Sequence, residues 1–188
     1  MATGRVMAAL VLAGLSAAVQ SERADYATVA DYVGVPEALL YAMALAESGR
    51  QHNRQFVPWP WTLNIEGEAQ FYPDRETMFS ALMAALRAKQ LRVDVGPLQV
   101  NWYWHYERLQ SPWRITDPVV NLKVAAQILK QHYQRSGDWL IAAGHYHRPS
   151  EATPADLARA QGYRERVSAL LDPSWSRVQP QGAPDATP

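Results

Sequence analysis

The sequence has no cysteine among its 188 residues. This absence excludes a disulfide framework, a catalytic thiolate and cysteine-ligated zinc. It does not exclude export, because a domain of this size can be stable without disulfides. The chain also lacks an excess of charge of either sign, since 18 Lys and Arg residues balance 18 Asp and Glu residues. The chain as a whole therefore offers no electrostatic case for nucleic-acid binding.

The N-terminus carries the feature that indicates a compartment. Arg5 precedes an apolar run at residues 6–15, and the small residues 16–18 follow it. This order is typical of a secretory signal peptide, so we expect cleavage after Ala18 and a periplasmic mature chain. A membrane anchor and a packed N-terminal helix are the alternatives. Because the run is too short to cross about 30 Å of hydrocarbon comfortably, we expect no stable membrane span after cleavage.

The rest of the sequence suits a single domain followed by a tail. Nearly half of the residues, 48%, are apolar, which is enough to build one core. We expect that domain to span residues 19–171. From residue 172 onward the sequence turns to proline, glycine, alanine and polar residues. Residues 172–188 are therefore predicted to form a disordered tail, in which Trp175 is the one large apolar side chain.

Helical periodicity and capping residues predict a mainly α fold of the α+β type. The expected helices cover residues 36–48, 74–90, 101–109, 117–134, 138–145 and 153–171. Between the first two, residues 61–72 alternate around Glu66, Gly67 and Glu68 in the manner of a small hairpin. We expect this hairpin to be the only sheet of the protein.

The first expected helix places a carboxylate at its C-terminal end. Leu39, Leu40 and Met43 recur at helical spacing after Pro36, so Glu47 lies in the last turn. Unpaired carbonyl groups at a helix end carry partial negative charge, which favours the protonated form of such a carboxyl group. A general acid that cleaves a glycosidic bond needs this bias. For an isolated glutamate, however, a solvated surface position is the ordinary interpretation.

Glu47 belongs to the first of four sequence fragments that, taken in order, resemble those of a known family. They are AES at residues 46–48, DVGPLQVN at 94–101, NLKVAA at 121–126 and AAGHYH at 142–147. Together they resemble the lytic transglycosylases of the soluble-transglycosylase (SLT) type, which belong to the lysozyme superfamily. The resemblance covers residues 26–171. The aspartate that opens the second fragment and the PWPWTLN insert at 58–64 are most similar to members that accompany conjugation, pilus or type IV secretion machines.

The resemblance implies a lysozyme-like helical domain with one small β-hairpin, acting on peptidoglycan. In the family, the glutamate that matches Glu47 protonates the glycosidic oxygen between N-acetylmuramic acid and N-acetylglucosamine. It then acts as a base while the sugar's own 6-hydroxyl attacks, which gives a 1,6-anhydro product. The reaction needs no cofactor. The implied partners are peptidoglycan glycan strands and components of a secretion or conjugation machine.

A hydrolase would need a second carboxylate, about 5–5.5 Å away as a nucleophile or about 6.5–9.5 Å away as a base for water. Asp94 is the candidate, and Glu66 and Glu68 on the hairpin are further possibilities. The alternative for Asp94 is structural, because aspartate favours turns, where it holds backbone amides, and Gly96 follows closely. We prefer the structural role.

Substrate contacts are expected from polar residues of the same fragments. Gln99 is expected to bind sugar hydroxyl or acetamido groups, and Asn101 either does the same or caps a helix. Both point to one face if the segment is extended. Ser48 matches the family's E-S pair, in which the hydroxyl can hold the carboxyl group, with helix capping as the alternative. Tyr146 matches the family tyrosine that lies near the acid, with core packing as the alternative.

The sequence departs from the family at two places. Pro97 and Leu98 replace the leucine and methionine of the common G-L-M-Q form, and we expect them to keep an apolar cleft wall. After Tyr146, His147-Arg148-Pro149 replaces the family's Asn-Ala-Gly. The match of the tyrosine is therefore firmer than anything downstream of it.

Aromatic residues bracket these fragments, and flat indole rings suit stacking on sugars. We expect Trp59 or Trp61 to line the cleft. At least half of the other nearby aromatics are expected to be structural; these are Trp102, Tyr103, Trp104 and Tyr106. The five histidines invite a metal site. His145 and His147 are two positions apart and do not face one ligand on a helix, so no metal is expected.

Three functions therefore compete. The leading one is a periplasmic lytic transglycosylase that opens peptidoglycan locally for an envelope-spanning machine. The second is a muramidase that uses water, and the third is a peptidoglycan-binding assembly factor without activity. An intact Glu47 argues against the third, because binding alone needs no acid.

Overall fold

The computed structural model describes residue 23, residues 25–171 and residue 175. The expected signal peptide at residues 1–18 lies outside them, as does the expected tail apart from Trp175. Trp175 is 8% exposed and belongs to the hydrophobic core. At this residue the expectation of a disordered tail is wrong, and the packed domain reaches past residue 171.

The fold is mainly helical, as the sequence predicts. After a helical segment at residues 25–33, the helices are α2 (Glu37–Ser48), α3 (Arg75–Arg87), α4 (Trp102–Leu109), α5 (Pro112–Ile115), α6 (Pro118–Ser136), α7 (Trp139–His147) and α8 (Pro154–Leu170). The predicted capping residues all accept hydrogen bonds from backbone amides of the first turn; they are Asp74, Asn101, Asp117, Asp138 and Thr153. These local bonds explain why the helix starts are predictable. The sequence does not predict the short helix α5.

The predicted hairpin is present, but it is not the only sheet. Strands β3 (Thr62–Ile65) and β4 (Glu68–Phe71) pair antiparallel around the turn at residues 66–67. Strands β5 (Val93–Val95) and β6 (Val100–Asn101) extend them to a four-stranded sheet with the order β4-β3-β5-β6. Strands β1 (Gly49–His52) and β2 (Gln55–Pro58) form a separate two-stranded sheet. The expectation of a single hairpin is wrong because such short strands hold too few residues for an alternating pattern to reveal them.

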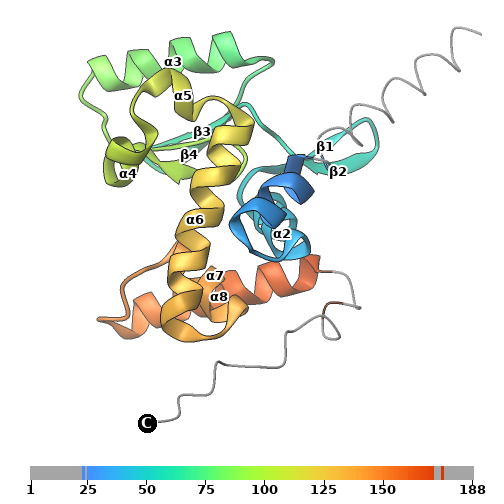
Figure 1. The fold of residues 1–188 in the computed structure, drawn as a ribbon. Coiled ribbons are helices and arrows are strands. Elements are labelled where there is room, and N and C mark those ends of the chain that lie inside the picture. The colour runs from blue at the N-terminus through green and yellow to red at the C-terminus, as the bar shows by residue number, and fades with distance from the viewer. Residues whose placement is uncertain (1–22, 24, 172–174, 176–188) are drawn as a thin grey trace, which may run out of the picture.

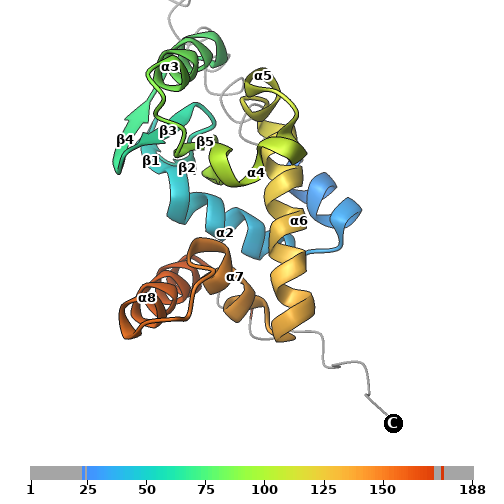
Figure 2. The ribbon, with the colours of Figure 1, turned by 90° about the vertical axis from the view of Figure 1, so that its left-hand side faces the viewer.

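Helix α6 runs along the length of the molecule. In Figure 1 it extends from the end formed by α3, α5 and the four-stranded sheet to the end formed by α7 and α8. Figure 2 shows α2 beside α6, between these two ends. Leu39, Leu40 and Met43 of α2 are fully buried, so this helix is held firmly in the core. It also packs against β2 and α8.

Candidate active site

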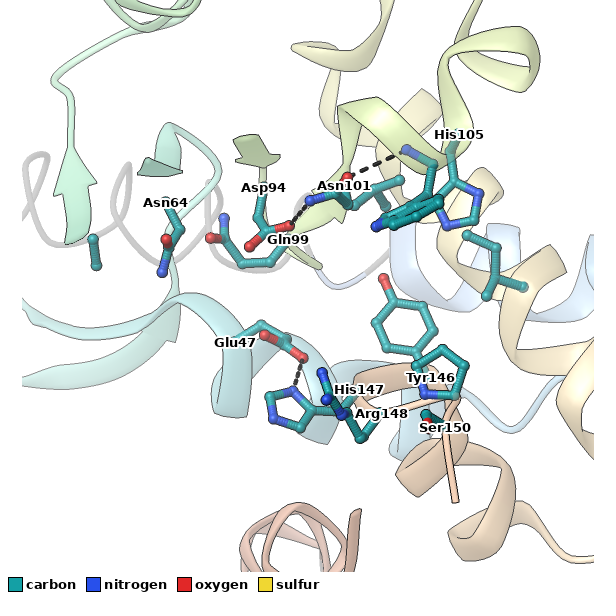
Figure 3. Close-up of a pocket in the computed structure, with 15 residues that line it drawn as sticks. Glu47, Asn64, Asp94, Gln99, Asn101, His105, Tyr146, His147, Arg148 and Ser150 are labelled. Carbon is teal, nitrogen blue, oxygen red and sulfur yellow. Dashed lines mark hydrogen bonds and ion pairs between the residues drawn. The ribbon is translucent and has the colours of Figure 1, made fainter. Parts of the chain in front are cut away.

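A cavity of about 780 Å³ opens beside the last turn of α2. Its walls come from α2, the four-stranded sheet, α4, α6, the end of α7 and the segment that follows α7 (Figure 3). The residues that line it are Glu47, Asn64, Ala69, Asp94, Gln99, Val100, Asn101, Trp104, His105, Ile128, Tyr146, His147, Arg148, Pro149 and Ser150. Of the predicted site residues, Glu47, Gln99, Asn101 and Tyr146 therefore share one cavity.

Glu47 lies in the last turn of α2, as predicted, and its side chain is 14% exposed. Its Oε1 atom is 3.7 Å from Nδ1 of His147, which ends α7. The His147 ring stacks on Tyr163 of α8, with ring centroids 4.4 Å apart and an angle of 4° between the planes. His147 is thus held beside the acid at a position where the resembling family has asparagine.

Tyr163 lies behind this pair and was not predicted from the sequence. Burial raises the pKa of its hydroxyl well above the ordinary value, and the charge of Glu47 acts in the same direction. The hydroxyl is therefore close to the Glu47 carboxylate, yet no partner meets hydrogen-bond geometry within the described residues. A tyrosine in a helix with an unremarkable pattern gives no sequence sign of such a position.

Asp94 enters the cavity from the side opposite Glu47 (Figure 3). It lies on β5, opposite Asn101 of β6 in the strand register, and the Asn101 amide donates a hydrogen bond of 2.7 Å to its carboxylate. Burial raises the pKa of Asp94 to about 6, and the nearby Glu47 carboxylate acts in the same direction against the hydrogen bond from Asn101. The expectation that Asp94 holds backbone amides of a turn is wrong, because its carboxylate binds the side chain of Asn101 and faces the cavity.

Asn101 has a structural role in two directions. Its amide nitrogen binds Asp94, and its carbonyl oxygen accepts a hydrogen bond from the backbone amide of Trp104, which caps α4. Both halves of its amide are thus occupied, although the residue lines the cavity.

Gln99 adopts a positive φ of 47°, so the segment is not extended here. The expectation that Gln99 and Asn101 point to one face depended on an extended segment. Its amide nitrogen donates to the carbonyl oxygen of Gly96 (2.8 Å), and its side chain still reaches the cavity. Neither Pro97 nor Leu98 lines the cavity, and Leu98 is fully buried in the core. The expected apolar cleft wall from these two residues is therefore wrong, since the turn points Leu98 inward.

Ser48 does not hold the Glu47 carboxyl group. Its hydroxyl has one proton, which lies within reach of the carbonyl oxygens of Pro97 (2.8 Å) and Ala44 (3.1 Å), and its oxygen accepts from the backbone amide of Trp59 (3.2 Å). The serine is buried and joins the end of α2 to two other segments. Its match to the family pair thus marks a structural junction next to the acid.

Tyr146 lies near the acid, as the resemblance implies. Burial raises the pKa of its hydroxyl well above the ordinary value, and the charges of Glu47 and Asp94 act in the same direction. The hydroxyl therefore stays protonated and donates a hydrogen bond of 2.6 Å to the carbonyl oxygen of Leu98. Tyr146 lines the cavity, but the proton of its hydroxyl group is already used in this hydrogen bond to the backbone.

The tryptophan that lines the cavity is Trp104, not Trp59 or Trp61. The indole nitrogen of Trp59 donates to the carbonyl oxygen of Tyr72 (2.7 Å), and Trp61 packs against the core. Trp104 is 67% exposed, which is unusual for so large an apolar side chain. Its position in the first turn of α4, three residues after the capping Asn101, is the signal that could have placed it at the cavity.

The segment that replaces the family's Asn-Ala-Gly forms one wall of the cavity. Arg148 binds the buried Asp156 through two nitrogen atoms, each 2.6 Å from the same carboxylate oxygen, and Ser150 binds its other oxygen at 3.1 Å. These bonds fix the segment to α8. Within the part of the chain that the structure describes, no group of three or more His, Asp or Glu side chains is placed to hold a metal ion.

Comparisons of the chain with protein-family models, with curated proteins and with solved structures found no match. Among residues 23, 25–171 and 175, no helix has both the length and the apolar character needed to cross a membrane. The function of the protein is therefore inferred from the cavity and from the sequence fragments that build it.

Proposed function

We propose that this protein is a peptidoglycan lytic transglycosylase, which cleaves the β-1,4 bond between N-acetylmuramic acid and N-acetylglucosamine and forms a 1,6-anhydro sugar. The observation that carries the proposal is the mostly buried carboxyl group of Glu47 in a cavity of about 780 Å³. That volume lies within the usual range of small-ligand sites. The carbonyl oxygen of Gln99 and the amide nitrogen of Asn64 remain available to sugar hydroxyl and acetamido groups.

In the proposed reaction, Glu47 gives its proton to the oxygen that leaves with N-acetylglucosamine while the C1–O4 bond breaks. The resulting carboxylate takes the proton of the 6-hydroxyl of N-acetylmuramic acid as O6 bonds to C1. The proton returns to Glu47 and no water is consumed, so one residue serves both steps. His147, 3.7 Å away, offers the intermediate carboxylate a cationic partner when its ring is protonated.

The position of Asp94 favours hydrolysis as the second candidate function. Asp94 is a cavity carboxylate, close enough to Glu47 for the charge of one group to raise the pKa of the other. A glycosidase that uses water needs two carboxyl groups in different environments, one as acid and one as base or nucleophile. A muramidase would therefore lose activity on Asp94→Asn as completely as on Glu47→Gln.

The proposal includes a location and a partner, which rest on the N-terminal pattern and on the family resemblance. Peptidoglycan lies outside the cytoplasm, and residues 1–18 have the order of a signal peptide. We propose that the mature chain works in the periplasm, without a cofactor. There it opens peptidoglycan locally for a secretion or conjugation apparatus.

Digestion of purified peptidoglycan, followed by mass spectrometry of the soluble products, tests the proposal. We expect 1,6-anhydro-muropeptides from the parent protein. Reducing ends would support the muramidase instead. Binding to peptidoglycan without release of any muropeptide would support a non-catalytic assembly factor.

A further inference from the structure

Three helices each send a polar side chain to the backbone of one loop. The loop consists of residues 95–98: it starts at Val95, the last residue of β5, and runs through most of the turn that leads to β6 at the edge of the cavity. Ser48 of α2 donates a hydrogen bond of 2.8 Å to the carbonyl oxygen of Pro97. Tyr146 of α7 donates one of 2.6 Å to the carbonyl oxygen of Leu98. The loop is thus anchored from two directions by hydroxyl groups.

Asn121 of α6 supplies the third anchor and is 0% exposed. Its amide nitrogen donates to the carbonyl oxygen of Val95 (2.7 Å), and its carbonyl oxygen accepts from the backbone amide of Leu98 (3.2 Å). One side chain therefore ties both ends of the loop. Gly96 has a φ of +80°, and a Cβ atom there would lie 2.7 Å from the Asn121 amide, so the loop and the asparagine fit only with glycine.

The anchored loop positions the groups that face the proposed acid. Asp94 precedes the loop and Gln99 follows it, and both line the cavity with Glu47. Ser48 is the chain neighbour of Glu47, so its bond to Pro97 links the acid directly to the loop. The three anchoring side chains therefore act together with the pairing of β5 to β3 and β6 to hold Asp94 in place relative to Glu47.

We propose that Ser48, Asn121 and Tyr146 form a clamp on the loop at residues 95–98 that decides whether the sugar's 6-hydroxyl or water attacks the anomeric carbon. The inference rests on the transglycosylase function proposed above. The three clamp residues are positioning residues, because each acts through the backbone of the loop and none donates to a reacting atom.

The two reactions begin with the same step and differ in the nucleophile. After Glu47 protonates the leaving oxygen and the C1–O4 bond breaks, either O6 of the same sugar or a water oxygen bonds to C1. The proton of the 6-hydroxyl passes to the Glu47 carboxylate, whereas the proton of water passes to the carboxylate of Asp94, the second group that hydrolysis needs, so both routes balance. Attack by O6 needs the sugar held in a near-attack geometry, and a displacement of about 1 Å can cost roughly 10²-fold. Water is mobile and can enter a loosened site. Loss of a clamp hydrogen bond should therefore slow attack by O6 more than attack by water.

The test compares products of purified peptidoglycan after digestion by clamp variants and by matched controls. Tyr146→Phe and Ser48→Ala each remove one anchoring hydroxyl group, and Asn121→Ala removes the third anchor. The matched control for the tyrosine is Tyr133→Phe, whose ring stacks on Trp139 away from the loop. The matched control for the serine is Ser80→Ala, because the hydroxyl group of Ser80 donates to the carbonyl oxygen four residues before it and binds no other group in the part of the chain that the structure describes.

We expect the fraction of reducing-end products to rise at least severalfold in the clamp variants while total release falls. The controls should keep the parental ratio. Asn121→Ala leaves two buried backbone groups unpaired and can fail to fold, in which case Tyr146→Phe and Ser48→Ala decide the matter. Folded clamp variants that lose activity at an unchanged product ratio overturn the clamp alone. Reducing ends or no products from the parent overturn the proposed function, and the clamp proposal falls with it.

Discussion

At the scale of single residues, the proposed chemistry depends on the proton of Glu47. Glu47→Gln keeps the shape of the side chain but removes the transferable proton, so the fold and sugar binding should survive. We expect cleavage to fall by roughly 10²–10⁴-fold. Release of muropeptides measures cleavage, and thermal unfolding measures the fold. Glu37→Gln, at the exposed first turn of the same helix, is the matched control. A well-folded Glu47→Gln protein with near-parental activity would reject the assignment.

A second prediction for a single residue concerns Asp94, whose raised pKa should make the stability of the protein depend on pH. Its folded-state pKa of about 6 exceeds the ordinary value of 3.8, so the folded protein binds this proton more tightly than the unfolded chain does. The resulting stabilisation is fully present below about pH 4 and is lost as the pH rises through about 6. It amounts to at most about 3 kcal/mol.

Asp94→Asn removes this titration while keeping an oxygen that can accept the hydrogen bond from Asn101. We therefore expect the free energy of unfolding of the variant, relative to the parent, to rise between pH 4 and pH 7. Denaturant titrations at the two pH values measure it. An identical pH dependence in parent and variant would show that Asp94 titrates normally in the folded protein.

At the scale of helices and strands, the sequence predicts what is local. The starts of α3, α4, α6, α7 and α8 each follow from a cap whose side chain and backbone partners lie within about three residues of each other. The clamp is different, because Ser48 and Tyr146 bind carbonyl groups 49 and 48 positions away in the chain. The resemblance places both residues near the acid, but no local pattern shows which atoms they bind. For the same reason the sequence did not predict the positions of Trp104 and Tyr163, which depend on how separate helices pack.

The loop between β5 and β6 gives a prediction about its glycine. Gly96→Ala places a side chain at a φ of +80° and within 2.7 Å of Asn121. Gly67→Ala, in the turn between β3 and β4, also has a positive φ of 94° but meets nothing within 4 Å. Both variants bear the cost of the left-handed backbone, and Gly96→Ala should lose roughly a further 1–3 kcal/mol from overpacking. Chemical denaturation of the two variants measures this difference in the free energy of unfolding. Equal losses of stability in both variants would mean that Asn121 and the loop shift to make room for a methyl group.

At the scale of the whole molecule, the cavity joins parts that lie far apart in the chain. Its lining residues come from positions between Glu47 and Ser150, carried by two ends of the molecule that α6 connects. Buried core residues such as Trp175 are not among the lining residues, so one of them can be removed without removing a group of the cavity. A change at the edge of the core away from the cavity should lower stability without changing the reaction.

Trp175 allows that separation to be tested. It is buried in the core but contributes nothing to the cavity lining. A chain that ends at residue 171 loses it, whereas a chain that ends at residue 176 keeps it and serves as the matched control. Loss of a buried tryptophan typically costs about 3–5 kcal/mol, so the shorter chain should melt well below the longer one. Both should release the same muropeptides at a temperature where each remains folded. Equal melting temperatures would show that Trp175 packs without stabilising the domain, and a changed product pattern would show that the cavity depends on it.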